Sequence, residues 1–160
     1  MKRILIACYS RTGINATVCQ QLQSQLQCDL EMITDTKNRN GLLGFISGGF
    51  DALFRKMTPI KPIERDPNDY ELVVIATPIW AGTISPAIRT YLFNNREKFK
   101  SIALLSVSGN GAKNQKAVTD FTKLVGKQPI ITLLLSEKEV KQKTYQAKLK
   151  DFAQVIQAFN

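Results

Sequence analysis

The stretch KRILIAC at residues 2–8 runs directly into YSRTGINATVC at residues 9–19, and this junction points to the fold. The first part is apolar almost throughout, which is typical of a strand that is buried on both faces of its sheet. The second part begins with hydroxyl-bearing residues and Gly13, and from Ile14 onward its apolar residues recur every four positions, as in a helix. The junction therefore predicts a buried strand that turns sharply into a helix.

The same alternation of strand and helix continues along the rest of the chain. Short stretches rich in Ile, Leu, Val or Ala predict strands at residues 2–9, 29–34, 70–77, 101–107 and 129–135. Helical patterns lie between them, of which one starts with a cap and a proline at Ser85-Pro86 and the last spans about 137–158. Because strands that are apolar throughout need helices on both faces, we expect an α/β fold that is doubly wound around a parallel sheet.

Residues 35–69 interrupt this regular order. The segment is too long for a simple connection. It starts polar, continues as GLLGFISGGFDALFRKM and ends in a stretch with several prolines. We expect an amphipathic helix over about 42–56, followed by an extended return to the sheet.

Length and composition favour one globular domain over residues 1–160. A chain of 160 residues with 44% hydrophobic content can build a sizeable core without disulfides or a structural metal. The net charge is +9, but the basic residues are dispersed, and the densest group has the spacing of the solvated face of the last helix. The charge therefore does not favour nucleic acid as a partner, although it can steer the protein towards acidic proteins.

The cysteine and histidine content excludes several classes of site. Cys8, Cys19 and Cys28 are odd in number and lack the spacing of a zinc site, and the sequence has no histidine. We therefore expect buried free thiols, no metal site and a reducing compartment, so that the cytoplasm is the expected location. No apolar run approaches the roughly 18 residues of a membrane span, and the apolar stretch near the start is shorter than that of a signal peptide.

The loop after the first strand has the residues of a phosphate cradle. Parallel sheets of this kind bind ligands beyond the carboxyl ends of their strands. Ser10, Thr12 and Asn15 offer side-chain hydrogen bonds, Gly13 allows a tight turn, and the following helix points its free N–H groups at the same place. An ordinary helix cap remains the alternative for this loop alone. The sequence lacks the glycine motifs of nucleotide triphosphatases and dinucleotide folds, which argues against ATP and nicotinamide nucleotides as the tightly held ligand.

Two further strand ends carry unusual residues. The loop ATPIWAGTISP at 76–86 contains the only tryptophan, Trp80, which is either a stacking surface for an aromatic ring or a packed anchor. The loop SVSGNGAKN at 106–114 is rich in glycine, which permits a flat ligand to approach the backbone closely. Together the three loops suit a mononucleotide with a large aromatic head.

The segments ILIACYSRTG at 4–13, VVIATPIWAGTISPAIRTYL at 73–92 and SVSGNG at 106–111 resemble the flavodoxin-like family, in particular short-chain flavodoxins and related flavodoxin-domain proteins. The resemblance spans essentially the whole chain. It implies a doubly wound three-layer sandwich with a five-stranded parallel sheet of order 2-1-3-4-5 and with FMN at its edge.

The resemblance also implies which residues contact FMN. Around the phosphate it places Ser10, Arg11, Thr12, Gly13, Ile14 and Asn15. Beside the isoalloxazine it places Thr77, Pro78, Ile79, Trp80, Ala81 and Gly82. Along the other edge of the ring it places the residues from Ser108 to Gly111, including Gly109 and Asn110.

This chain departs from the family pattern at three points. Where the family has T-G-N-T, this chain has Thr12-Gly13-Ile14-Asn15, so Asn15 takes the place of the second hydroxyl. The loop at 106–114 has no tyrosine or tryptophan to cover the ring. Flavodoxins are usually acidic, whereas this chain has a net charge of +9, so we expect an acidic redox partner.

We therefore expect an FMN-binding electron-transfer protein, a one-electron carrier without catalytic side chains. Two alternatives remain open at this point. One is an FMN-dependent oxidoreductase that reduces quinones or similar acceptors with NAD(P)H. The other is a degenerate flavodoxin-fold binding module that has lost tight FMN binding. The apolar residues of 41–57 either pack in the core or flank the flavin and shape access to it.

Overall fold

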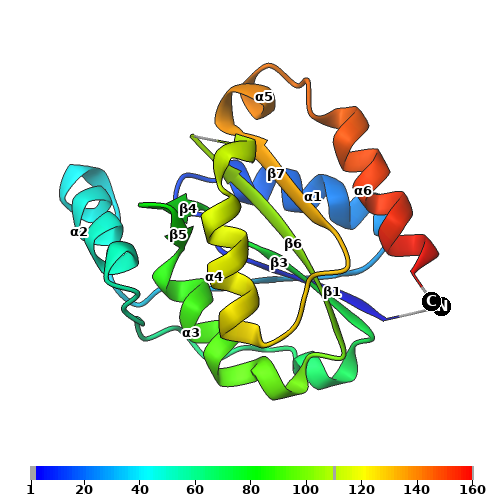
Figure 1. Ribbon diagram of the computed structural model, residues 1–160, viewed down its shortest axis with the longest axis horizontal. Helices are drawn as coiled ribbons and strands as arrows, with labels where there is room; N and C mark the ends of the chain where they lie inside the picture. Colours follow the sequence, from blue (N-terminus) through cyan, green and yellow to red (C-terminus); the bar gives the residue numbers. More distant parts are fainter. Residues whose placement is uncertain (1–2, 110, 160) are drawn as a thin grey trace.

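The computed structural model of the protein describes residues 3–109 and 111–159. Five parallel strands form one sheet in the order β2-β1-β3-β6-β7 (Figure 1). The strands are β1 Ile4–Cys8, β2 Asp29–Met32, β3 Leu72–Ala76, β6 Ser101–Ser108 and β7 Thr132–Ser136. Each lies within two or three residues of its predicted position, and the strand order confirms the predicted doubly wound α/β fold.

Helices cover both faces of the sheet. One face carries α1 Ile14–Leu26, α5 Glu137–Lys141 and α6 Gln146–Ala158, and the other carries α3 Pro86–Asn95 and α4 Gln115–Val125. Three short 3-10 helices connect the elements, at Pro67–Asp69, Arg96–Lys98 and Gly111–Lys113. A two-stranded antiparallel hairpin, β4 Ile79–Trp80 and β5 Thr83–Ile84, and helix α2 Gly41–Leu53 lie beside this sandwich.

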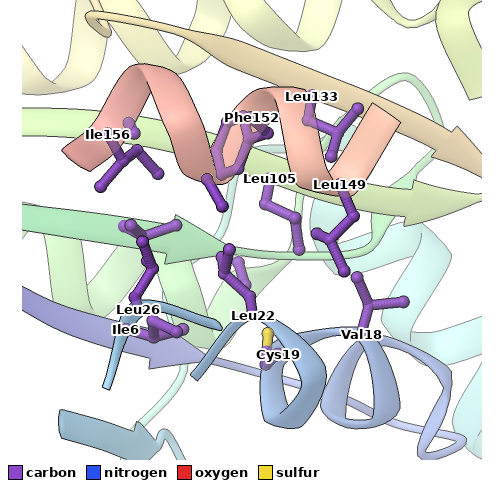
Figure 2. Close-up of a cluster of buried hydrophobic side chains, with 14 of the residues drawn as sticks. Ile6, Val18, Cys19, Leu22, Leu26, Leu105, Leu133, Leu149, Phe152 and Ile156 are labelled. Atoms are coloured by element: carbon purple, nitrogen blue, oxygen red, sulfur yellow. The ribbon is translucent and has the colours of Figure 1, made fainter. Parts of the chain in front are cut away.

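The central strands supply a separate hydrophobic core on each face. Ile6 of β1 points towards α1 and α6, where it packs in one cluster with Leu22 and Phe152 (Figure 2). Leu5, its neighbour in sequence, points to the opposite face and packs in one cluster with Phe121 of α4. Full burial of one such side chain contributes about 1.5–3 kcal/mol. The continuous apolar character of these strands thus follows from two buried faces, as predicted.

The C-terminal segment differs from the single helix predicted over 137–158. The chain leaves α5 through Lys143, whose φ is +56°, and α6 starts only at Gln146. A capping box between Ser136 and Glu139 starts α5. The hydrogen bond from Lys148 is the main cause that lowers the pKa of Glu139 to about 2, and the hydrogen bonds from Ser136 contribute to the same shift. The break lets Tyr145 turn into the core, where its hydroxyl donates a hydrogen bond of 2.7 Å to Gln21 of α1.

The predicted helix within residues 35–69 is present, but its burial is the reverse of ordinary core packing. Helix α2 buries the small residues Gly44, Gly48 and Ala52. Its large apolar side chains point away from the core, and the interpretation that they pack there is wrong: Phe45, Phe50, Leu53 and Phe54 are 54% to 58% exposed. After α2 the chain returns in extended form, as predicted, and Lys61 donates a backbone hydrogen bond of 2.9 Å to Thr34.

The three cysteines are free thiols. Cys8 and Cys19 are buried as expected, whereas Cys28 is only half-buried. A hydrogen bond with Cys8, together with burial, raises the pKa of Cys19 well above its ordinary value. In the part of the chain that the structure describes, no helix is long and apolar enough to cross a membrane.

Helix α2 contacts the protein through its small residues, which predicts that alanine substitutions at two of its glycines change the free energy of unfolding in opposite directions. A side chain at Gly44 would overlap the backbone of Arg39, so Gly44→Ala should lower the free energy of unfolding by about 1–3 kcal/mol. Nothing lies within 4 Å of a side chain at Gly49, so Gly49→Ala should raise it by about 0.5–1 kcal/mol. Urea unfolding followed by circular dichroism measures both, and equal stability of the two variants would contradict the seating of α2 on Arg39.

Candidate functional site

Three loops leave the sheet at the same edge. Cys8 at the end of β1 lies opposite Ala76 at the end of β3, and Ala76 lies opposite Leu105 of β6. A cavity of about 420 Å³ opens at this edge. Its lining comprises Arg11, Phe45, Gly49, Pro78, Ile79, Trp80, Ala81, Gly82, Val107, Ser108, Gly109, Asn114 and Glu137. This volume lies within the range of about 300–1,000 Å³ that is usual for small-molecule sites.

The loop after β1 presents unpaired polar groups at the start of α1. Gly13 has a φ of +88°, which glycine adopts without strain, and its carbonyl accepts a hydrogen bond of 2.9 Å from the N–H of Thr17. The first N–H groups of a helix have no partner within the helix and carry its positive dipole end. Among the described residues, Ser10 Oγ is buried without a hydrogen-bond partner. The loop therefore combines a free hydroxyl with a helix N-terminus, which suits an anion.

The side chain of Asn15 joins α1 to the sheet. Its Nδ2 donates to the carbonyl of Val107 at 3.2 Å, and its Oδ1 accepts from the N–H of the same residue at 3.1 Å. Asn15 is 4% exposed, so both bonds are shielded from water. The sequence suggests that this amide takes the place of a phosphate-binding hydroxyl. In the structure the same amide is already bonded to Val107, a contact that the sequence does not reveal.

The hairpin after β3 turns tightly towards the cavity. Ala81 and Gly82 both have positive φ, +49° and +74°, as the two central residues of a type I′ turn require. Thr77, one of the predicted contact residues, is fully buried and braces this hairpin instead of lining the cavity. Its Oγ1 lies 3.0 Å from the hydroxyl of Ser85 and donates to the carbonyl of Pro78 at 2.9 Å.

Trp80 combines the two roles between which the sequence left a choice. One side of its ring lies on Gly48, where an added Cβ would come within 3.0 Å of Cζ3. The ring of Tyr9 meets the ring of Trp80 edge-on at a centroid distance of 5.8 Å. Burial is the main cause that raises the pKa of Tyr9 to about 12, and the charge of Asp35 adds to it. Trp80 is nevertheless only half-buried and lines the cavity. It is a packed residue that still offers a surface to a ligand.

Asn114 holds the loop after β6 in place, a role that sequence reasoning missed. Its Nδ2 donates to Ser108 Oγ at 2.6 Å and to the carbonyl of Gly111 at 2.9 Å. Gly111 is buried against Ser136 with a φ of +52° and does not line the cavity, whereas Gly109 does. The only hint of this role in the sequence is that Asn114 stands just before a helix, where an asparagine side chain commonly bonds to nearby backbone groups. The predicted contact at Asn110 lies outside the described residues.

Two helices that are distant in sequence complete the lining. Phe45 of α2 faces the cavity, and the guanidinium of Arg11 lies 5.2 Å from the centre of its ring. Glu137, the first residue of α5, is the one carboxylate among the lining residues, and its side chain is 43% exposed. Sequence reasoning did not place a carboxylate here, because nothing in the order of residues shows that the end of β7 lies beside the loops after β3 and β6.

The predicted contact residues therefore fall into three groups. Those that line the cavity are Arg11, Pro78, Ile79, Trp80, Ala81, Gly82, Ser108 and Gly109. Those that surround the start of α1 are Ser10, Thr12, Gly13, Ile14 and Asn15. Thr77 and Gly111 support the loops from behind.

A second hollow of about 420 Å³ lies beside the first, at the ends of β1 and β2. Arg11 lines both, and the second also includes Tyr9, Ser10 and Lys37. Buried Arg39 lines it too, in ion pairs with Asp35 at 3.0 Å and Asp51 at 2.9 Å. A larger hollow of about 530 Å³ between α1 and α6 contains no strand-end loop. Within residues 3–109 and 111–159, no cluster of three or more His, Cys, Asp or Glu side chains could hold a metal ion.

Comparison with known proteins gives relatives in structure but not in sequence. No protein-family model matches the chain, and no curated protein does. A flavoprotein from Lactobacillus acidophilus NCFM, solved in complex with FMN, superposes with a TM-score of 0.73 at 21% identity, over 89% of this chain and 98% of that one.

Two further solved structures are similar over nearly the full length of the chain. The Fusobacterium nucleatum flavodoxin bound to flavin mononucleotide has a TM-score of 0.59 at 15% identity, over 99% of this chain and 98% of that one. A flavodoxin, WrbA-like protein from Agrobacterium tumefaciens has a TM-score of 0.55 at 11% identity, over 96% and 98%. At these identities the likeness establishes the fold.

The two hydrogen bonds between the side chain of Asn15 and the backbone of Val107 predict a large loss of stability when the amide is removed. Asn15→Ala should lower the free energy of unfolding of the ligand-free protein by about 1–3 kcal/mol, because it leaves buried polar groups of Val107 without the partner they have here. Asn94→Ala, at an exposed position of α3, is the matched control and should change it by less than about 0.5 kcal/mol. Urea denaturation measures both. Two equally stable variants would show that the amide is not needed to anchor α1.

Proposed function

We propose that this chain, which has a flavodoxin-like fold, binds FMN at the edge of its sheet and transfers electrons through it. The observation that carries the proposal is the arrangement beyond the carboxyl ends of the strands: loops from β1, β3 and β6 line the cavity, and Ser10, whose hydroxyl has no partner among the described residues, lines the adjoining hollow. The likeness to FMN-bound structures of the same fold supports the choice of ligand.

The loop after β1 fits the phosphate. A buried hydroxyl without a partner costs free energy, and a phosphate oxygen would supply the missing acceptor for Ser10 Oγ. The backbone N–H groups from Thr12 to Asn15 provide further donors, and they do not depend on which side chain stands at Ile14. Arg11 adds a positive charge on the cavity side of this loop. With the side chain of Asn15 bonded to Val107, we assign its contribution to the backbone.

The rest of the cavity fits a flat aromatic ring. Trp80 and the hairpin turn at Ala81 and Gly82 line one part of it, and Gly109 lines another. The loop after β6 brings no aromatic side chain, but Phe45 of α2 lines the same cavity and can cover the ring. This supports the hypothesis that the segment 41–57 flanks the flavin and shapes access to it through Phe45 and Gly49, whereas Phe50, Leu53 and Phe54 do not line the cavity.

FMN supplies the redox chemistry when it is bound, and the protein supplies binding, orientation and electrostatics. Arg11 and Glu137 are the ionisable side chains of the lining, and they place one charge of each sign beside the ring. Thr77, Asn15 and Asn114 hold the three loops rigid, so that little structure needs to change when the flavin changes its charge. Among the described lining residues none is a cysteine or a hydroxyl activated by a base, which favours electron transfer without covalent catalysis.

The second hollow favours an FMN-dependent reductase as the second candidate. It adjoins the cavity at Arg11, and it carries the cationic side chains of Lys37 and Arg11 towards an open volume of about 420 Å³. A small acceptor or donor could occupy this space next to a bound flavin. A one-electron carrier, by contrast, exchanges electrons with a partner protein and needs no second pocket.

The absorption spectrum after incubation with FMN and desalting tests the proposal. We expect the flavin bands to stay with the protein, because the phosphate loop and the ring cavity bind one ligand together. Stepwise reduction through one-electron states supports the carrier, and steady oxidation of NAD(P)H with a quinone supports the reductase. Loss of all flavin on desalting, with no saturable binding by titration, would contradict both and leave the degenerate binding module.

The proposed contact between the Ser10 hydroxyl and the phosphate predicts that removal of this hydroxyl weakens the binding of FMN but not that of riboflavin. Ser10→Ala should weaken FMN binding about tenfold to hundredfold, since a hydrogen bond to a charged group is worth about 1.5–3 kcal/mol. It should not lower the stability of the ligand-free protein, because Ser10 Oγ has no partner among the described residues. It should leave the affinity for riboflavin, which lacks the phosphate, unchanged. Fluorescence titration with both flavins measures this. Ser24→Ala on α1 is the control, and an equal loss for FMN and riboflavin would place Ser10 away from the phosphate.

A further inference from the structure

The outward side of α2 and the residues after it form an apolar ridge. Its members are Leu42, Leu43, Phe45, Ile46, Phe50, Leu53, Phe54 and Met57, which are 50% to 82% exposed. Elsewhere in the described chain, three exposed large apolar side chains are scattered and are only 44% to 45% exposed: Met32, Phe93 and Val155. Scattered apolar residues are normal on a protein surface, whereas a contiguous group marks an interaction site.

The ridge lies directly opposite the side of α2 that is attached to the protein. Successive residues of a helix are about 100° apart, so Gly44, Gly48 and Ala52 form one seam and Ile46, Phe50 and Leu53 lie on the other side. The seam is held by Gly48 against Trp80 and by the hydroxyl of Thr83, which donates to the carbonyl of Ala52 at 2.9 Å. The large side chains therefore cannot turn inward while these contacts exist.

The charges around the ridge are positive. Lys37, Arg55 and Lys56 have side chains 52% to 56% exposed, and Lys61 is exposed beyond them. Asp51 is the only carboxylate in residues 36–61, and it is 13% exposed and paired with Arg39, Lys37 and Lys56. Arg55 is paired with Asp120, and Lys61 adds a further positive charge. The complementary surface is thus apolar and negative.

We propose that α2 docks the protein on the surface of an anionic lipid bilayer. The ridge enters the boundary between headgroups and acyl chains, and Lys37, Lys56 and Lys61 reach the phosphates around it. Figure 1 places α2 at one end of the long axis of the molecule, so the ridge meets a flat surface before most of the sandwich does. The helix lies in the interface and does not cross the membrane.

A second copy of this chain fits the ridge less well than a bilayer does. In an isologous dimer the lysines around the ridge, Lys37, Lys56 and Lys61, would lie close to the same lysines of the second copy. Two copies with a net charge of +9 each also repel one another.

A soluble acidic protein fits less well for another reason. Specific protein interfaces carry about one hydrogen bond per 100–200 Å², which sets the register of the partners. The side chains of the ridge are hydrocarbon or thioether, and the one hydroxyl of α2, Ser47 Oγ, already donates to Gly44 at 3.2 Å. A bilayer needs no register, since its apolar interior is fluid.

Docking would bring the cavity close to the lipid surface. Phe45 belongs to the ridge and also lines the cavity, together with Gly49 of the same helix. The docking itself does not depend on FMN, because it rests on the ridge and its charges alone.

Flotation with lipid vesicles tests the proposal. We expect the protein to bind vesicles of phosphatidylcholine with about 30% phosphatidylserine, to bind pure phosphatidylcholine at least about tenfold less, and to be released by high salt. Leu43→Gln with Phe50→Gln should reduce binding about tenfold or more, since it removes two side chains of the ridge. Neither residue lines the cavity, so FMN titration of this variant should match the parent chain, which separates failure of docking from failure of the proposed function.

Matched variants at other places on the surface provide the controls. Phe93→Gln with Val155→Gln removes exposed apolar side chains away from the ridge and should leave binding unchanged. Lys56→Gln with Lys61→Gln should weaken binding more than Lys123→Gln with Lys150→Gln. No binding to anionic vesicles at low salt, or equal binding by the ridge variant and its control, would overturn the proposal. A dimer in sedimentation that the ridge variant abolishes, without vesicle binding, would overturn it in favour of a second copy.

Discussion

The parallel register of β1, β3 and β6 is the constraint on which the rest of the structure depends. These strands are buried on both faces, so their backbone N–H and C=O groups must pair with neighbouring strands, and the pairing sets Cys8 opposite Ala76 and Ala76 opposite Leu105. All three strands then end at one edge, and the three loops meet there. A shift of one residue would move a strand by about 3.3 Å, so that its side chains would no longer fit the two cores and its loop would no longer lie level with the other two.

Hydrogen bonding separates the residues that build the site from those that remain available to a ligand. Asn15, Thr77 and Asn114 are buried, and their polar side-chain atoms bond to protein groups. Each of them holds one of the three loops in place. Ser10 Oγ is also buried but has no partner within the described residues. The hydroxyl of Ser10 therefore stays available to a ligand, and residue type alone does not show this difference, because all four side chains are polar.

Helix α2 connects the site with the surface of the protein. Glycine and alanine at every fourth position let its backbone approach Arg39 and Trp80 closely, and this close approach leaves the large side chains no room on the inner side. They are consequently exposed, except that Phe45 also reaches the cavity. The same glycine pattern therefore supports the wall of the cavity and produces the apolar ridge, so that the cavity wall and the proposed docking surface belong to one helix.

The sequence by itself determined the order of strands and helices, the parallel sheet buried on both faces and the three loops that carry the site, because these follow from periodicity and from turn residues that act over a few positions. Tertiary structure decided what depends on distant neighbours. Glu137 joins the cavity because β7 ends beside β6, Asn15 is bonded because Val107 lies next to it, and the chain breaks before Tyr145 because that side chain packs on α1. An apolar pattern in α2 does not reveal which side is buried, since the choice lies in the glycines that fit Arg39 and Trp80, and that fit exists only in the folded protein.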